Sequence, residues 1–419
     1  MGTILFMIAL CVEIGFCVWA FAVKQRHQKE KEVVRLTGLL LLILLVLMGV
    51  LQGFVRYGAF IFILALQLLL GGIKIIKHKD KPIQKGKMVI ASIGSLFLYL
   101  FCLAPAFLFP QYTEPLVTGT HQVAIKEYTW VDDGRVETYT NTGEDRELTV
   151  KFFYPEEEGT YPLVVFSHGA FGVIDSNFST CKELASNGYV VVSIGHTYHA
   201  MYLKNVKGKV FLANAEFMNS VMEENGTRDP EGEAIVYGNS KVWMDIRCKD
   251  ENFVLDTILE KVAQEEGGPF SLINPEKIGL FGHSMGGATS AQVGRERDDI
   301  DAVVDLEGTM FGEYVDFQNG TEVFNEEPYT VPILDVNSGD IDRQARELPG
   351  QGYVNFYVGE HATDYHYQVV EGAGHLNFTD LPLVSPFLAK MLGTGDIDAR
   401  ECIESTNQMI LDFFNNYLK

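Results

Sequence analysis

Proline and cysteine are scarce in this sequence, and basic residues are outnumbered by acidic ones. Proline accounts for 14 of the 419 residues while aromatic residues make up 12%, which excludes collagen-like and disordered chains. A formal net charge of −22 argues against a nucleic-acid partner, because a polyanion would be repelled. The six cysteines and the histidines show no metal-ligand spacing, so we expect neither a metal nor another cofactor.

The charges are divided unevenly along the chain. Residues 1–112 contain 12 Lys and Arg against 4 Asp and Glu, whereas residues 113–419 contain 21 against 51. The change falls near the segment 110–114. We therefore expect a first domain over 1–112 and a second domain over 113–419.

Four long apolar segments fill the first domain. They cover roughly 3–23, 34–51, 57–77 and 88–109, and each approaches the ~20 residues that a helix needs to cross a bilayer. The first segment lacks the basic flank and the cleavage site of a signal peptide. The sequence therefore predicts an all-α transmembrane unit of four helices.

Charged connections predict the orientation of these helices. Lys and Arg cluster at 24–35 and 74–87, two connections on the same side of a four-span unit, and such clusters stay in the cytoplasm. The second domain would then lie outside the cell, as part of a multi-pass protein of the cell membrane. Glu13 lies within the first span, where a charge is costly, and we expect it to be protonated or to face the other helices.

The second domain alternates strand-like and helix-like segments. The strands are continuous runs of Val, Ile and Leu, which favour a parallel sheet covered on both faces, and their alternation with helices predicts a doubly wound α/β domain. Residues 197–240 are polar and loop-like, and we expect an insertion or lid there. The expected strands are 147–153, 162–167, 189–194, 277–282, 301–306, 331–336 and 365–370; the expected helices are 176–187, 241–265, 285–296 and 402–418.

The segment Gly282-His283-Ser284-Met285-Gly286 matches the G-x-S-x-G pattern. It follows an apolar strand and opens a helix-forming stretch, which is the context that the pattern requires. Side chains at 282 and 286 would collide with the neighbouring elements, and the helix N-terminus favours developing negative charge. The sequence therefore predicts Ser284 as a nucleophile on a strained turn.

A second motif lies upstream, where an apolar strand ends in Ser167-His168-Gly169-Ala170. A strand that ends in His-Gly positions a free backbone N–H for an oxyanion. We expect the oxyanion hole to combine the N–H of Met285 with that of Ala170, or less favourably with that of Phe171. His168 precedes the nucleophile, and we expect it to be structural.

The general base is expected after the nucleophile in chain order. His375 lies in Gly372-Ala373-Gly374-His375, a glycine-rich loop that follows a strand near the C-terminus, and such a loop can present one histidine to the serine. His361 and His366 lie before or within that strand and are weaker candidates, while His283 is expected to pack beneath the turn.

Three acids are candidates for orienting His375. Asp305 ends the strand that follows the nucleophile helix, Asp340 follows the next strand, and Glu307 is a third option. Asp340 lies in an acidic run that is typical of a solvated loop. Asp305 follows three apolar residues, so we expect it to be buried.

Together these segments resemble the α/β-hydrolase superfamily, and within it the platelet-activating-factor acetylhydrolase family of lipases and esterases. In that family the acid follows the strand after the nucleophile helix, which implies Asp305. The residues after Asp305 read Leu-Glu-Gly-Thr-Met, where the family commonly has bulky aromatic residues, so the acyl pocket is expected to differ. The resemblance rests on 166–169, 184–191, 282–289, the Asp305 strand, 332–338 and 374–380.

We therefore expect a membrane-anchored serine hydrolase of carboxylic esters. The resemblance implies lipid or small-molecule ester substrates, including short-acyl phospholipids, and hence a role in lipid degradation. Two alternatives are a catalytically inactive receptor or scaffold on the same fold, and an accessory domain of a membrane transporter.

Overall fold

The computed structural model describes residues 1–25, 27–52, 54–77, 84–224, 230–348 and 350–419. The chain divides into two compact units, which are described separately below. The first comprises Met1–Thr113 and Leu383–Leu388, and the second comprises Glu114–Pro382 and Ala389–Lys419. Part of the basic connection expected at 74–87 and part of the insertion expected at 197–240 lie outside the described residues.

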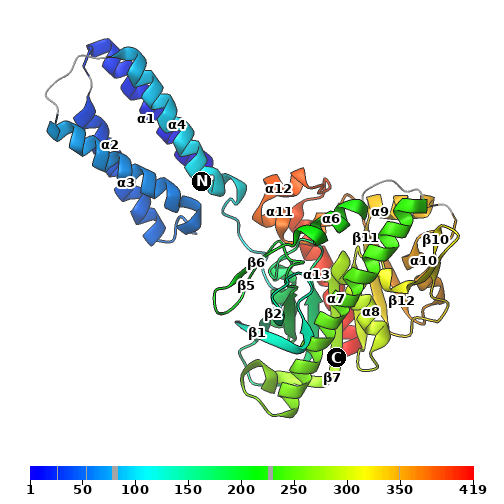
Figure 1. Cartoon of the computed structure of the whole chain (residues 1–419). Coiled ribbons are helices and arrows are strands. Elements are labelled where there is room, and N and C mark those ends of the chain that lie inside the picture. The colour runs from blue at the N-terminus through cyan, green and yellow to red at the C-terminus, as the bar shows by residue number, and fades with distance from the viewer. Residues whose placement is uncertain (26, 53, 78–83, 225–229, 349) are drawn as a thin grey trace. The chain divides into compact units, whose positions relative to one another are not determined.

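The first unit contains four long helices (Figure 1), and α4 packs against α1 and α3 while α2 packs against α3. In the described part of the chain, three stretches are long and apolar enough to cross a membrane: Gly2–Val23, Arg56–Ile76 and Lys85–Leu108. The expected span 34–51 is not among them, because the helix that contains most of it, α2, begins with the charged sequence Gln-Lys-Glu-Lys-Glu. The bounds are α1 Gly2–Val23, α2 Gln28–Leu47, α3 Phe54–Lys77 and α4 Lys85–Leu108.

Glu13 faces the interior of the first unit and is 1% exposed. Its carboxylate accepts hydrogen bonds from Lys31 and Arg35 of α2 and from Ser92 of α4. A buried charge requires such partners, because its separation from water is otherwise unfavourable. Charged residues at the start of α2 thus compensate the acid in α1.

The second unit is built on an eight-stranded sheet with the order β1-β2-β4-β3-β7-β8-β11-β12. Strands β4, β3, β7, β8, β11 and β12 run parallel to one another. Strand β2 pairs antiparallel with β4, and β1 pairs antiparallel with β2. The expected α/β class is confirmed, and every expected strand is present. The bounds are β1 Val123–Val136, β2 Asp145–Pro155, β3 Tyr161–Ser167, β4 Val190–Gly195, β7 Ile273–His283, β8 Ala302–Leu306, β11 Ile333–Ser338 and β12 Tyr365–Val370.

Both faces of the sheet are covered by helices. Helices α7 (Pro230–Ala263) and α8 (Met285–Glu296) pack on one face, and α5 (Phe178–Ser186) and α13 (Ala399–Leu418) contribute to the core on the other. In Figure 1, α7 and α8 lie together in front of the sheet. Alternate residues of one strand enter opposite cores, which explains the unbroken apolar runs.

The segment 197–240 is more regular than expected. It contains a hairpin of β5 (Tyr202–Lys204) and β6 (Val210–Leu212), then α6 (Ala215–Glu224) and the start of α7. Phe217 of α6 is 1% exposed, so this polar segment gains its order by burying a few apolar side chains. The other elements are β9 Tyr314–Gln318, β10 Thr321–Phe324, α9 Gly339–Glu347, α10 Val354–His361, α11 Leu381–Val384, α12 Pro386–Met391 and the short 3-10 helices Gly268–Leu272, Phe311–Glu313 and His375–Phe378.

Candidate active site

Ser284 occupies a sharp turn between the end of β7 and the start of α8. Its backbone adopts φ 57° and ψ −126°, a left-handed conformation that is unfavourable for a residue with a side chain. The turn is held by the Ser284 N–H, which donates to the Leu306 carbonyl at 2.9 Å. The side chain is partly exposed, so its hydroxyl can meet a substrate.

The glycines around Ser284 are required by close packing. A Cβ atom on Gly282 would lie 2.1 Å from the carbonyl carbon of Gly286, and one on Gly286 would lie 1.9 Å from the Ser167 carbonyl oxygen. A Cβ on Gly287 would lie 1.8 Å from Oδ1 of Asp305. The turn therefore tolerates no side chain at these three positions without a shift of backbone or buried carboxylate.

His375 begins a short 3-10 helix beyond β12, and its side chain is 42% exposed. The loop is anchored by Asn377, whose Oδ1 accepts the N–H groups of Gly374 at 2.9 Å and Gly395 at 2.8 Å. His283 lies beneath it, with the two imidazole centroids 4.5 Å apart and Nε2 donating to the His375 carbonyl at 2.9 Å. Burial lowers the pKa of His283 to about 3, which keeps that ring neutral.

The acid that contacts His375 is Glu307. Its Oε2 lies 2.6 Å from Nδ1 of His375, and its side chain is 2% exposed. Its Oε1 accepts the Ser338 N–H at 2.8 Å. The Glu307 backbone has φ 55° and its N–H donates to the Val336 carbonyl at 2.8 Å. The carboxylate is therefore fixed on both oxygens before any substrate binds.

Asp305, the acid favoured by the resemblance, makes different contacts. It is fully buried within β8, where Oδ1 accepts the Gly308 N–H at 2.8 Å and Oδ2 lies 3.5 Å from Nδ2 of Asn355. None of its hydrogen bonds in the described structure goes to His375. Strand β8 continues to Leu306, so Asp305 points toward the nucleophile helix instead of over the edge of the sheet. Burial and the nearby Asp335 raise its pKa well above the ordinary range.

Asp340, the other alternative, lies on α9 and pairs with Arg343 at 2.5 Å on the surface. The geometry therefore joins His375 to the third option, Glu307, and to neither of the two favoured acids. In the sequence, Glu307 could have been found by its position as the first residue after the strand that becomes β8. The backbone reversal at that residue, which aims the carboxylate at His375, could not be inferred from residue types.

The two expected oxyanion donors have free N–H groups. Within the described residues, the N–H groups of Ala170 and Met285 donate to no protein acceptor. The N–H of Phe171, in contrast, donates to the His199 carbonyl at 3.1 Å. A Cβ on Gly169 would lie 3.1 Å from Cβ of Ser284, so this loop passes directly beside the serine. The arrangement leaves Ala170 as the available donor of that loop.

His168 is not placed as a base. It is fully buried, its Nδ1 donates to the Gly169 carbonyl at 2.7 Å, and burial lowers its pKa well below the ordinary value. His361 contacts the Tyr357 carbonyl. His366, near the start of β12, contacts the hydroxyl of Tyr417 on α13. Among the residues that the structure describes, no three His, Cys, Asp or Glu side chains gather as metal ligands.

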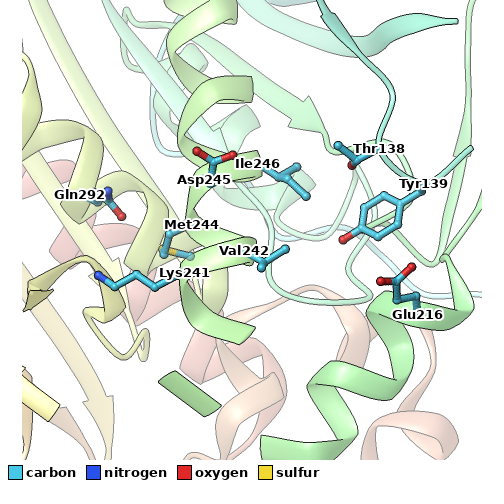
Figure 2. Close-up of a pocket in the computed structure, with 9 residues that line it drawn as sticks. All are labelled: Thr138, Tyr139, Glu216, Lys241, Val242, Met244, Asp245, Ile246 and Gln292. Atoms are coloured by element: carbon cyan, nitrogen blue, oxygen red, sulfur yellow. The ribbon is translucent and has the colours of Figure 1, made fainter. Parts of the chain in front are cut away.

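A separate pocket of about 620 Å³ opens along α7 (Figure 2). Ser284 and His375 are not among its lining residues. Tyr139 and Glu216 form one side, and Lys241 and Gln292 form the other. The remaining lining residues are Thr138, Val242, Met244, Asp245 and Ile246.

The family model described as platelet-activating factor acetylhydrolase, isoform II, matches residues 117–224 and 271–419. The platelet-activating factor acetylhydrolase of Gallus gallus is 26% identical over 294 residues, covering 64% of each chain, and that of Bos taurus is 24% identical over 279 residues, covering 62% of this chain and 57% of its own. The chain thus matches less than two thirds of these relatives' length.

A ferulic acid esterase from Streptomyces cinnamoneus has a similar structure, with a TM-score of 0.53 and 22% identity over 72% of this chain and 92% of its own. This likeness and the order of the strands confirm the expected α/β-hydrolase fold.

Proposed function

Because this chain belongs to the platelet-activating factor acetylhydrolase, isoform II, family, we propose that it is a serine hydrolase of carboxylic esters. Two observations carry the proposal: the strained backbone of Ser284, and the 2.6 Å contact between Nδ1 of His375 and the buried Glu307 carboxylate. The two parts are linked by His283, the neighbour of Ser284, whose ring lies 4.5 Å from that of His375. A serine hydroxyl is a weak nucleophile until an oriented base removes its proton.

In the proposed reaction, Oγ of Ser284 attacks the ester carbonyl carbon while Nε2 of His375 accepts the hydroxyl proton. The N–H groups of Ala170 and Met285 hold the oxyanion of the tetrahedral intermediate. Collapse of this intermediate breaks the bond to the alcohol, which leaves with the proton from His375. Water then attacks the acyl-enzyme by the same route and releases the carboxylic acid.

Glu307 takes the role of the acid in place of Asp305. Its Oε2 accepts the Nδ1–H of His375, which leaves the Nε2 lone pair free for the serine proton. The same contact stabilises the imidazolium that forms after proton transfer. Because the Ser338 N–H holds the other oxygen, the carboxylate keeps its orientation through both steps.

We propose short-acyl phospholipid esters as the substrate class. This substrate class is supported by the relatives from Gallus gallus and Bos taurus, which are named platelet-activating factor acetylhydrolases. Purified full-length protein assayed on esters of graded acyl length should favour the shortest chains. A preference for long acyl chains would contradict this substrate class but leave the ester hydrolase proposal intact.

The apolar helices support a membrane anchor. We propose that α2 crosses the membrane together with these three helices, which puts both Lys and Arg clusters on the cytoplasmic side and the catalytic unit outside the cell. In whole cells, an Asp298→Cys variant should react with a membrane-impermeant maleimide, because Asp298 is exposed on the catalytic unit. The native cysteines of that unit are buried, so the unsubstituted protein is the control. Protection of the new cysteine until the cells are permeabilised would overturn this orientation.

The test of the chemistry is Ser284→Ala. Loss of the nucleophile should lower ester turnover by about 10⁴–10⁶-fold. The matched control is Ser271→Ala, an exposed serine whose hydroxyl donates to the Gly268 carbonyl, and it should retain full turnover. Ester hydrolysis that survives Ser284→Ala would refute the proposal.

A further inference from the structure

The oxyanion loop is held by a buried arginine from α7. Nη1 of Arg247 donates to the His168 carbonyl at 2.5 Å, and Nη2 lies 3.3 Å from the Gly169 carbonyl. The guanidinium is fully buried. The guanidinium of Arg247 thus donates to the carbonyls of the two residues that precede Ala170.

The contact with Gly169 bears directly on the Ala170 N–H. The carbonyl of Gly169 and the N–H of Ala170 belong to one peptide unit, which is planar and trans, so they point in opposite directions. The Gly169 carbonyl also accepts Nδ1 of His168 at 2.7 Å and the Gly172 N–H at 3.1 Å. Arg247 is the charged donor of this set, and by helping to fix the carbonyl it also helps to fix the direction of the N–H. A positive charge at the carbonyl end polarises the amide and makes its N–H a stronger donor.

His199 contacts both Arg247 and the same loop, one residue beyond Ala170. Its carbonyl accepts the Phe171 N–H at 3.1 Å, and its Nδ1 accepts Nε of Arg247 at 3.0 Å. Its Nε2 lies 2.8 Å from the hydroxyl of Tyr139, which lines the pocket in Figure 2. The ring of Phe217 stacks on it with centroids 3.8 Å apart. The imidazole therefore has little freedom to release the arginine.

The environment of Arg247 is unusual for a buried cation. Within the described residues its hydrogen bonds go to two carbonyls and one imidazole, all of them neutral acceptors. The nearby Asp250 is occupied by Arg146 and Arg135. Burying a charge without a direct carboxylate partner is costly, and a merely structural site could be filled by an apolar side chain. The positive charge at this loop therefore calls for a functional explanation.

The segment that supplies Arg247 lies outside the family match. The family model covers 117–224 and 271–419, and the whole of α7 falls in the gap. The carbonyls that receive the guanidinium, in contrast, lie in the matched part. A helix that the family model does not cover thus contacts the oxyanion loop of the matched fold.

From these contacts, we propose that Arg247, braced by His199, is a positioning residue that aims and polarises the Ala170 N–H toward the oxyanion. The proposal rests on the proposed ester hydrolysis at Ser284. Its consequence is confined to the transition state, because an ester carbonyl carries full negative charge only in the tetrahedral intermediate. Substrate binding in the ground state should be almost unaffected.

The test compares Arg247→Met, Arg247→Lys and the wild-type full-length protein. Arg247→Met keeps the aliphatic stem but removes all donors, and we expect kcat to fall about 10- to 100-fold, less than the loss of a whole oxyanion donor, with KM nearly unchanged. Arg247→Lys keeps the charge but cannot span both carbonyls, so kcat should be intermediate. Lys249→Met, an exposed change on the same helix, is the control and should behave as wild type.

A second readout separates positioning from general damage to the fold. A thionoester places sulfur, a poor hydrogen-bond acceptor, in the oxyanion hole, so the variants should lose far more activity on the ester than on its thiono analogue. If Arg247→Met does not fold, Arg247→Lys carries the test. Three results would overturn the proposal: a folded variant with wild-type kcat, a variant in which only KM changes, or a variant whose activity falls equally on the ester and on its thiono analogue. Failure of the underlying ester hydrolysis would be recognised separately, by a wild-type protein whose turnover does not depend on Ser284.

Discussion

Two acidic residues, Asp305 and Glu307, differ in environment although one residue separates them. Glu307 touches His375 through Oε2, while Asp305 is enclosed beneath the nucleophile helix. Burial and the nearby Asp335 raise the pKa of Asp305, which disfavours the ionised form that would stabilise an imidazolium. The difference in contacts supports the proposal that Glu307, and not Asp305, orients His375.

We expect Glu307→Gln to lower kcat by about 10³–10⁴-fold, because the amide cannot reproduce the carboxylate that orients and compensates the imidazolium. Asp305→Asn, the matched control, resembles the protonated acid and should reduce kcat far less. Steady-state ester hydrolysis by both folded variants checks this. The reverse order of the two losses would restore Asp305 as the catalytic acid.

Glu251 is a buried acid on α7 that should make stability depend on pH. Burial raises its pKa from 4.5 to about 8, and its Oε2 has no partner among the described residues. The folded state therefore binds a proton more tightly than the unfolded state, so stability falls as pH rises from about 4.5 to about 8. The full effect is on the order of 4 kcal/mol.

Replacing the acid by its neutral analogue should remove this dependence. Glu251→Gln should be more stable than wild type at pH 8.5 and similar to it at pH 4.5, as followed by thermal unfolding across that range. Glu260→Gln, an exposed change on the same helix, should leave the profile as it is. Parallel profiles for wild type and Glu251→Gln would contradict the buried-acid interpretation.

Single residues were predictable from the sequence where the signal is local. Ser284 and its glycines form one short motif, and His375 follows a recognisable strand and glycine-rich loop. The contact between Glu307 and His375 was not predictable, because it depends on where β8 ends and on the left-handed backbone at Glu307. Arg247 gave no signal at all, since its role arises from contacts with a loop about 80 residues upstream.

Among the elements, the β7–α8 turn is the most constrained. A methyl group at Gly286 would overlap the Ser167 carbonyl, whereas one at Gly238 on α7 would meet nothing within 4 Å. We expect Gly286→Ala to abolish ester turnover or folding. Gly238→Ala should retain turnover and gain roughly 0.5–1 kcal/mol of stability, because alanine is the better helix former. Thermal unfolding and turnover of both variants distinguish these outcomes.

The regular elements were largely predictable, because continuous apolar runs identify strands that are buried on both faces. Strand β1 was not predicted, since it lies at the edge of the sheet and its half-buried and exposed side chains follow no regular alternation. The regular secondary structure of the insertion at 197–240 was not predicted, for a related reason. Its order depends on isolated buried side chains such as Phe217, which leave no periodic pattern.

At the scale of the whole molecule, the two parts of the chain carry net charges of opposite sign. The first unit is cationic and rich in apolar helices, while the second is acidic and has its own cores and the complete candidate site. This distribution is what an anchor joined to a catalytic domain requires. It gives no support to the alternative in which the hydrolase unit only assists a transporter.

Separation of the two parts tests the anchor. Residues 114–419 alone should hydrolyse a small water-soluble ester with a kcat close to that of the full chain, since every candidate catalytic residue lies there. Turnover of a phospholipid ester in vesicles should fall, because the anchor no longer holds the site near lipid. A folded 114–419 domain that cannot hydrolyse the soluble ester would show that the helices take part in catalysis.

The most direct test of the central claim is the site of covalent modification by a fluorophosphonate, mapped by mass spectrometry on the full-length protein. We expect one phosphonylated residue, Ser284, with labelling abolished by Ser284→Ala and slowed by Glu307→Gln but not by Asp305→Asn. Modification of a different residue, or no modification of a protein that still hydrolyses esters, would contradict the account.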